Sequence, residues 1–126
     1  MIEFMEKNER FYWFITKKND GKVIGTFGLR NFDFKKKSVE ISYGISPKFW
    51  NKGYFKTSLK LVLDFLFLEK KFHRVISTTH IEHESSIRGL KKLGFTHESL
   101  LREYIFMNNH WEDFVVYSIL DHEYKK

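Results

Sequence analysis

The sequence predicts an α/β domain built around one mixed, mostly antiparallel sheet with two flanking helices. Three features of the 126-residue chain predict this class. Short segments rich in aromatic and β-branched residues follow one another through the first third, with turn residues between them, as in antiparallel hairpins. Two stretches with apolar residues at helical spacing come next, separated by another strand-like segment. Two long strand-like segments end the chain, so the expected order is β-β-β-α-β-α-β-β in a single domain, residues 1–126.

The first half of the chain predicts three antiparallel strands. Aromatic and β-branched residues fill the first of them. Asn19-Asp20-Gly21 then supplies the residues of a tight turn, including a glycine that tolerates positive φ. In the third strand apolar residues recur at every second position, which indicates one buried face. The expected strands are Phe11–Thr16, Val23–Leu29 and Val39–Ile45, with the lysine run 35–37 in a solvated turn at 32–37.

The second half predicts alternating helices and strands. A loop that contains Pro47, the only proline, separates the third strand from the first helix. Apolar residues recur every three or four positions in both expected helices. The second helix ends in two lysines followed by Gly94, the glycine expected at the C′ position. The expected elements are a helix at Tyr54–Lys70, a strand at Arg74–Ile81, a helix at Glu84–Leu93, and strands at Thr96–Met107 and Trp111–Leu120 joined by Asn108-Asn109-His110.

Composition limits the class of protein and its surroundings. There is no cysteine, which excludes disulfides, thiolate metal ligands and a cysteine nucleophile, and suits a reducing compartment. Met1–Arg10 is charged and lacks the apolar run of a signal peptide, and the longest apolar stretch, Leu61–Leu68, is far too short to span a bilayer. These features predict a cytoplasmic protein without membrane contact. The formal net charge of +6 favours anionic partners, among them nucleic acid and a phosphorylated cofactor.

The loop before the first helix is the main candidate for a binding site. The first N–H groups of a helix have no intrahelical partner, and the helix dipole favours an anion there. Gly53 lets the backbone approach a phosphate closely. Lys52 and Lys56 flank the first turn, where the dipole disfavours cations by roughly 0.3–1 kcal/mol each, and a bound anion explains their position. Solvated surface lysines are the alternative, and the sequence contains neither a Walker P-loop nor a G-x-G-x-x-G motif.

Three composite motifs stand in order along the chain, each made of two short segments. The first is Val39–Ile45 followed by 49–54, Phe-Trp-Asn-Lys-Gly-Tyr. Ser85-Ser86-Ile87-Arg88 then runs into Lys92-Leu93-Gly94-Phe95, and Leu101-Arg102-Glu103-Tyr104 precedes His110-Trp111-Glu112-Asp113. Together these motifs resemble the GNAT family of N-acetyltransferases, in particular its ribosomal-protein (RimJ/RimL-like) branch. The resemblance covers roughly Phe11 to Tyr124.

The resemblance implies that acetyl-CoA is the cosubstrate. Its pyrophosphate is expected on the backbone N–H groups of residues 51–56, and its pantetheine arm beside the backbone of Ile45. His83 and Ser86 correspond to family positions that face the pantetheine and the thioester. The expected cofactor-binding residues are therefore Ile45, Asn51, Lys52, Gly53, Tyr54, Phe55, Lys56, Thr57, His83 and Ser86.

Three residues depart from the family pattern. Phe55 stands where a small residue is usual, so its ring either crowds the phosphates or packs into the core. His83 replaces the usual asparagine, and Leu90 stands where many relatives have a tyrosine general acid. Relatives also have several dozen more residues before the first strand. These departures leave open a GNAT-like module that binds acyl-CoA without effective catalysis, while a nucleic-acid-binding protein is disfavoured because the basic residues form no single stripe.

Acetyl transfer to an amine requires a base, a polarised thioester carbonyl and a proton for the leaving thiolate. Glu40, on the strand before the loop, is the main candidate base and is expected to act through water. The alternative is that its carboxylate faces solvent or pairs with a lysine. Ser86 is the candidate proton donor, and it is also expected to share with Ser85 the N-cap of the second helix.

Other residues are weaker candidates for a catalytic role. Glu103 is a second candidate base, and Tyr43 or Tyr104 could supply a phenol as the acid. His80 and His83 have no third ligand at a suitable spacing, so no metal is expected. The acceptor implied is a primary amine on a small molecule or a protein N-terminus, and a homodimer is a further expectation.

Overall fold

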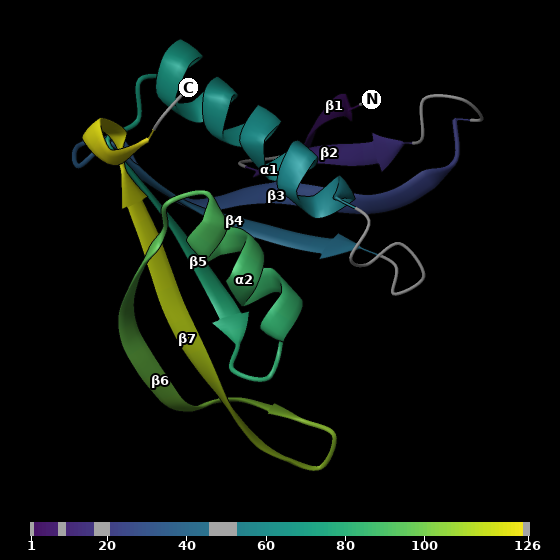
Figure 1. The fold of residues 1–126 in the computed structure, drawn as a ribbon, viewed down its shortest axis with the longest axis vertical. Coiled ribbons are helices and arrows are strands. Elements are labelled where there is room, and N and C mark those ends of the chain that lie inside the picture. The colour runs from purple at the N-terminus through teal and green to yellow at the C-terminus, as the bar shows by residue number, and fades with distance from the viewer. Residues whose placement is uncertain (1, 8–9, 17–20, 46–52, 125–126) are drawn as a thin grey trace.

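The computed structural model describes residues 2–7, 10–16, 21–45 and 53–124. Within these ranges the strands form one seven-stranded sheet in the order β1-β2-β3-β4-β5-β7-β6. Two helices lie in front of the sheet, and the β6–β7 hairpin extends away from them (Figure 1). The elements are β1 Ile2–Lys7, β2 Arg10–Thr16, β3 Val23–Asp33, β4 Ser38–Ile45, α1 Tyr54–Asp64, a π-helical turn η2 Phe65–Glu69, β5 Arg74–His80, α2 Glu84–Lys92, β6 Thr96–Met107, β7 His110–Leu120 and a 3-10 turn η3 Asp121–Glu123.

The mixed, mostly antiparallel sheet confirms the predicted fold class, but the predicted order omits one strand. β1 pairs antiparallel with β2, from Ile2↔Ile15 to Lys7↔Arg10, and forms one edge of the sheet. Three of its six residues are charged, so it has little strand propensity of its own. Pairing with the backbone of β2 stabilises it, and that contact is not visible in a local sequence pattern.

The other predicted elements agree with the structure to within a few residues. β3 continues to Asp33, four residues beyond the predicted end, and the turn that follows exposes the three lysines 35–37, as expected. Asn108 and Asn109 have φ of 53° and 64°, the left-handed conformation of a tight hairpin turn between β6 and β7. The Asn19-Asp20 part of the first predicted turn lies outside the described residues.

The long predicted helix is α-helical in its first part and π-helical at its end. α1 is α-helical as far as Asp64, and the chain continues as the π-helical turn Phe65–Glu69. Apolar residues at helical spacing bury one side of both parts, with Leu59, Leu63 and Leu66 inaccessible to solvent. They pack on apolar residues of the sheet such as Phe27, Ile41 and Val75. No helix among the described residues is long and apolar enough to cross a bilayer.

The second helix ends as its sequence predicts. Gly94 has φ of 100° and lies at the C′ position of α2. Its N–H donates to the Lys91 carbonyl at 3.0 Å, and the Phe95 N–H donates to the Leu90 carbonyl at 3.0 Å. These two bonds form a Schellman motif, so a residue with a side chain at position 94 would be strained.

The two central strands of the sheet pair only over part of their length. β4 and β5 are parallel, and their register runs from Ser38↔Arg74 to Ile41↔Ser77. β4 nevertheless continues to Ile45 and β5 to His80. The carboxyl ends of the two strands therefore diverge, and the sheet opens beside the starts of α1 and α2.

Candidate functional site

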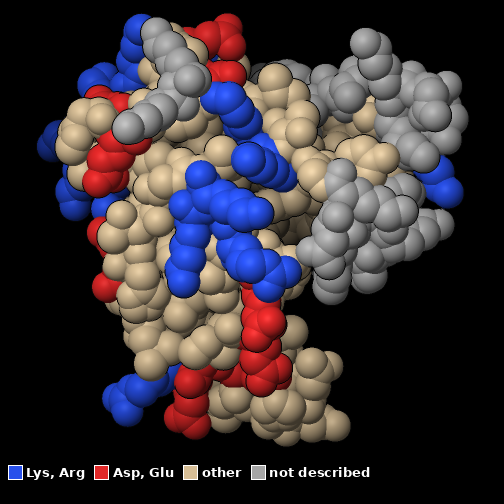
Figure 2. All heavy atoms as spheres, viewed as in Figure 1, with Lys and Arg blue, Asp and Glu red and all other residues tan. Residues whose placement is uncertain are grey.

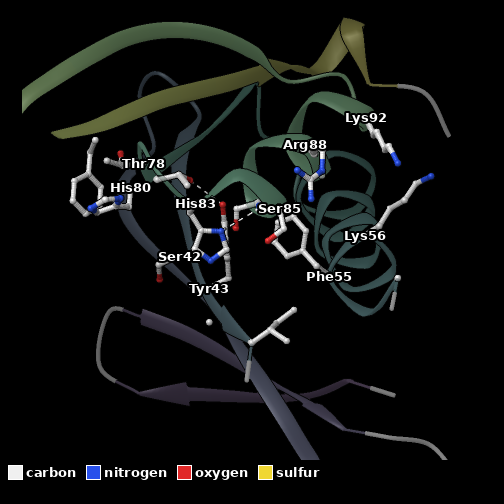
Figure 3. A pocket seen from close by; sticks show the side chains of 17 residues that line it. Ser42, Tyr43, Phe55, Lys56, Thr78, His80, His83, Ser85, Arg88 and Lys92 are labelled. Carbon is white, nitrogen blue, oxygen red and sulfur yellow. Dashed lines mark hydrogen bonds between the residues drawn. The ribbon is translucent and has the colours of Figure 1, made fainter. Parts of the chain in front are cut away.

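A cavity of about 440 Å³ lies where β4 and β5 diverge. Its walls come from the ends of these two strands, the first turn of α1, the length of α2 and Phe114 of β7 (Figure 3). The lining residues are Ser42, Tyr43, Gly44, Ile45, Gly53, Phe55, Lys56, Thr78, Thr79, His80, His83, Ser85, Ser86, Arg88, Gly89, Lys92 and Phe114.

Both faces of the sheet contribute to this cavity. Side chains alternate along a strand, so Tyr43 and Thr79 lie on the face that carries the helices. Ser42, Thr78 and His80 belong to the opposite face, yet they line the same cavity. The cavity therefore passes between two strands, and molecules on the two faces of the sheet can meet inside it.

A cluster of hydroxyl groups joins the diverging strands. The Tyr43 hydroxyl lies 2.9 Å from Thr79 Oγ1, and Ser77 Oγ donates to the Tyr43 oxygen at 3.2 Å. Ser77 is inaccessible to solvent and Thr79 is 5% exposed. Because buried hydroxyls are costly unless they are hydrogen-bonded, this cluster fixes the separation of the strands where the backbone pairing has ended.

The start of α1 has the features of an anion site. Gly53 precedes the helix with φ of 80°, and a Cβ built on it would meet no atom of the described residues within 4 Å. The N-cap residue is Gly53, which has no side chain to cap the helix, and the first turn contains no acidic residue. Lys56 nevertheless lies in this turn and lines the cavity. The start of a helix and a lysine side chain therefore adjoin the same cavity.

The start of α2 differs from the prediction. The N-cap is His83, whose Nδ1 accepts the Ser86 N–H at 3.2 Å. The expectation that Ser85 and Ser86 cap this helix is wrong, because both residues lie inside its first turn. The capping acceptor is the imidazole nitrogen of His83 and not a serine hydroxyl. With Nδ1 as the acceptor, the neutral His83 ring carries its proton on Nε2. Ser86 is buried and lines the cavity.

Phe55 packs into the core on the helix side of the sheet. Its ring stacks on Phe27 with centroids 6.0 Å apart and contacts the Tyr43 ring at 4.8 Å. A Cβ built on Gly89 of α2 would lie 2.5 Å from Phe55 Cε2. The Phe55 ring therefore fills the space that the glycine at position 89 leaves open. Of the two locations predicted for this ring, beside the phosphates or in the core, the structure shows the core.

The predicted cofactor residues are in large part brought together. Ile45, Gly53, Phe55, Lys56, His83 and Ser86 line the cavity. Tyr54 and Thr57 belong to the first turn of α1 but not to the lining, and Asn51 and Lys52 lie outside the described residues. Sequence reasoning missed Arg88 and Lys92, two cations that also line the cavity. Their i,i+4 spacing on a helix, which places both on one side, is the pattern that could have found them.

Glu40 lies near the cavity but does not line it. It is 6% exposed, and its carboxylate accepts bonds from Arg30 Nη2 at 2.9 Å and Asn31 Nδ2 at 2.7 Å. It shares a sheet face with Ser42, two residues further along β4 and roughly 6–7 Å away along the strand. The partners are an arginine and an asparagine instead of the predicted lysine or solvent. Its role as a base through water stays a prediction.

The weaker catalytic candidates do not lie together in one site. Glu103 has φ of 48° in a bulge of β6, where its N–H donates to Asp113 Oδ1 at 2.8 Å, and it lines a separate hollow beside Tyr104. Tyr43 alone among the tyrosines proposed lines the main cavity. Leu90 is buried in the core. Among the described residues, no three His, Asp or Glu side chains are grouped so that they could hold a metal ion.

Two contacts between ionisable side chains outside the cavity connect elements of the fold: Arg74 with Glu98, and Tyr124 with Asp64. Hydrogen bonds from Arg74 lower the pKa of the Glu98 carboxyl, and the same contact raises the pKa of Arg74. Burial and a hydrogen bond to Asp64 raise the pKa of the Tyr124 phenol, which ties the end of the chain to α1. These shifts belong to the scaffold and not to the lining of the cavity.

The chain is thus an α/β domain whose sheet opens around a cavity, with the start of α1, the helix α2 and the three cations Lys56, Arg88 and Lys92 in its lining. The family model of the acetyltransferase (GNAT) domain matches residues 1–96, and the chain belongs to this family. The predicted resemblance is therefore confirmed at the level of the family.

Several similar proteins are named as acetyltransferases. YoaA of Bacillus subtilis (strain 168), an uncharacterized N-acetyltransferase, is 32% identical over 108 residues, 86% of this chain and 61% of YoaA. The ribosomal-protein-S5-alanine acetyltransferase from Vibrio fischeri superposes with a TM-score of 0.84 at 26% identity, over 93% of this chain and 64% of that one. Spermidine N(1)-acetyltransferase of Vibrio cholerae is 24% identical over 88% of this chain and 64% of that protein. The chain spans about three-fifths of the length of the curated relatives it matches.

Proposed function

We propose that this chain transfers an acetyl group from acetyl-CoA to a primary amine. The observation that carries the proposal is the cavity between the diverging ends of β4 and β5, which both faces of the sheet line and which begins at the N-terminus of α1. An acetyl donor on the helix side and an amine on the opposite side would meet there without either displacing the other.

The residues at the start of α1 suit the pyrophosphate of acetyl-CoA. The positive end of the helix dipole, the glycine backbone at Gly53 and the cation of Lys56 all favour an anion. Asn51 and Lys52 are proposed as further contacts on sequence grounds. The backbone of Ile45, at the end of β4, is the proposed partner of the pantetheine arm. When bound, acetyl-CoA supplies the activated thioester; the chain supplies binding, orientation and proton transfer.

The catalytic roles follow from the two faces of the cavity. Glu40 and Ser42 share the proposed acceptor face, so Glu40 would take the proton of the amine through a water that Ser42 helps to hold. Ser86, buried beside His83 at the start of α2, would donate a hydrogen bond to the leaving sulfur. Arg30 and Asn31 orient the Glu40 carboxylate for this role through the hydrogen bonds that they donate to it.

The acceptor is proposed only as a primary amine. One similar protein is named for spermidine and another for an alanine of ribosomal protein S5. The proposed acceptor is therefore an amine on a small molecule or on a protein N-terminus. A cytoplasmic location and a homodimer stay predictions.

The test compares Gly53→Glu with Gly53→Gln in acetyl-CoA titration calorimetry. Both side chains experience the same strain at a positive φ and enter the same open space, so they differ only in charge. We expect the glutamate variant to bind acetyl-CoA at least about tenfold more weakly than the glutamine variant, a difference of about 1.4 kcal/mol. Equal affinities would overturn the placement of the pyrophosphate.

A panel of primary amines tests the second half of the proposal. Turnover of acetyl-CoA with any amine, measured as released thiol, supports an enzyme. Binding of acetyl-CoA with no turnover on the whole panel would instead establish the non-catalytic acyl-CoA-binding module.

A further inference from the structure

Three cations gather at the helix end of the cavity. Lys56 comes from the first turn of α1, and Arg88 and Lys92 come from α2. In the close view they lie on one side of the cavity, while His80 and Thr78 lie on the other (Figure 3). Figure 2 shows basic side chains gathered near the middle of the face that carries the two helices. The cavity is therefore polarised, with a basic end at the helices.

Packing between the helices sets the position of these cations. Phe55 of α1 lies against Gly89 of α2. Lys56 follows Phe55 in the chain and Arg88 precedes Gly89, so the contact brings two cations of different helices to one opening. Lys92 stands four residues after Arg88, on the same side of α2. The core thus positions the helices that carry the three exposed cations.

The positive charges of this cluster have little compensation. Among the described residues, the one ion pair it makes is between Arg88 Nη1 and Glu84 Oε2, at 4.0 Å, with the Glu84 side chain 84% exposed. Such a pair is screened by water and leaves the guanidinium available. Lys56 and Lys92 form no ion pair within the described part of the chain. Three like charges around one opening favour an anion as their common ligand.

We propose that Lys56, Arg88 and Lys92 form a second phosphate subsite, which recognises the 3′-phosphate monoester of the cofactor's adenosine. The inference rests on the proposed function, since the pyrophosphate is assigned to the backbone at the start of α1. Arg88 and Lys92 belong to another helix and are not part of that loop. A terminal phosphate carries close to two negative charges and three acceptor oxygens, which suit a guanidinium and two ammonium groups arranged around it.

The experiment measures affinity for acetyl-CoA and for 3′-dephospho-acetyl-CoA by titration calorimetry. The wild type is expected to prefer acetyl-CoA by at least about tenfold. The double variant R88Q/K92Q should lose most of that preference while its affinity for the dephospho compound stays within about twofold of the wild type. K91Q is the matched control, because Lys91 lies on the same helix, is exposed and does not line the cavity. It should keep the full preference.

Other outcomes of these titrations would contradict the proposed subsite. Equal wild-type affinities for the two compounds would overturn the subsite and leave the proposed function intact. A double variant that loses the same factor for both compounds would also overturn it, because the two residues would then act on the pyrophosphate. A wild type that binds neither compound would overturn the proposed function as well. Circular dichroism of each variant checks that the fold is retained.

Discussion

Replacing Gly89 by alanine tests the contact that positions the two helices. The new methyl group would lie 2.5 Å from Phe55 Cε2 and 2.6 Å from Cδ2, well inside van der Waals contact. The ring cannot swing away freely, because it stacks on Phe27 and contacts the tilted ring of Tyr43. The substitution therefore forces α1 and α2 apart or moves an aromatic cluster of the core.

Two opposing terms set the size of the effect. Alanine in the middle of a helix is favoured over glycine by about 1 kcal/mol. Overpacking in a core costs about 1–3 kcal/mol. Gly89→Ala alone should therefore lower the free energy of unfolding by about 0–2 kcal/mol. In a Phe55→Ala background the clash is gone, so the same substitution should raise that free energy by about 1 kcal/mol. The expected coupling between the sites is about 1–3 kcal/mol.

Urea denaturation followed by far-UV circular dichroism measures the four proteins of this cycle. The decisive result is the sign of the alanine effect in the two backgrounds. If Gly89→Ala stabilises both backgrounds by the same amount, the two sites are uncoupled and the close packing of the helices is refuted. A change in the slope with urea in any variant would signal a loss of two-state unfolding.

Three further predictions concern residues outside this contact. Glu98→Gln should lower stability by about 0.2–1 kcal/mol above the ordinary glutamate pKa, because the Arg74 contact lowers the Glu98 pKa in the folded state. The difference should disappear as pH falls through that lowered pKa, as urea midpoints at several pH values will show. His83→Ala should cost about 0.5–2 kcal/mol through loss of the cap on the Ser86 N–H, and His83→Asn distinctly less, by thermal or urea unfolding. Glu40→Gln should lower stability by about 1–3 kcal/mol, because its two partners lose a charged acceptor, and should reduce amine turnover with little change in acetyl-CoA affinity.

Contrary results would be informative in each case. A Glu98 effect that persists unchanged at low pH would show that the carboxylate charge is not its origin. Equal losses for alanine and asparagine at position 83 would show that the imidazole does something other than capping. An intact rate of turnover in the Glu40 variant would leave that residue a purely structural role.

The sequence determined the local parts of this fold. Period-two alternation placed β4, and helical periodicity placed α1 and α2, because burial on one face leaves a direct pattern in the chain. Gly94 and the pair Asn108-Asn109 marked a helix end and a hairpin, because few residues tolerate positive φ. The loop at Gly53 was identified because its chemistry is also local: a glycine and cations at the first turn of a helix.

Contacts between distant segments required the tertiary structure. β1 exists because β2 pairs with it, and its own six residues do not predict a strand. The cavity exists because the β4–β5 pairing ends at Ile41, a property of two strands and not of either sequence. Glu40 obtained Arg30 and Asn31 as partners through the β3–β4 register.

Phe55 shows most clearly why sequence alone was insufficient. At the level of residue types, a phenylalanine beside the expected phosphate position was equally compatible with crowding the cofactor and with packing inward. Gly89, 34 positions later in the chain, decides between them because its missing side chain leaves the space that the ring fills. Such complementarity of volume depends on how two helices are packed, and no periodicity, charge or turn residue in either segment encodes it separately.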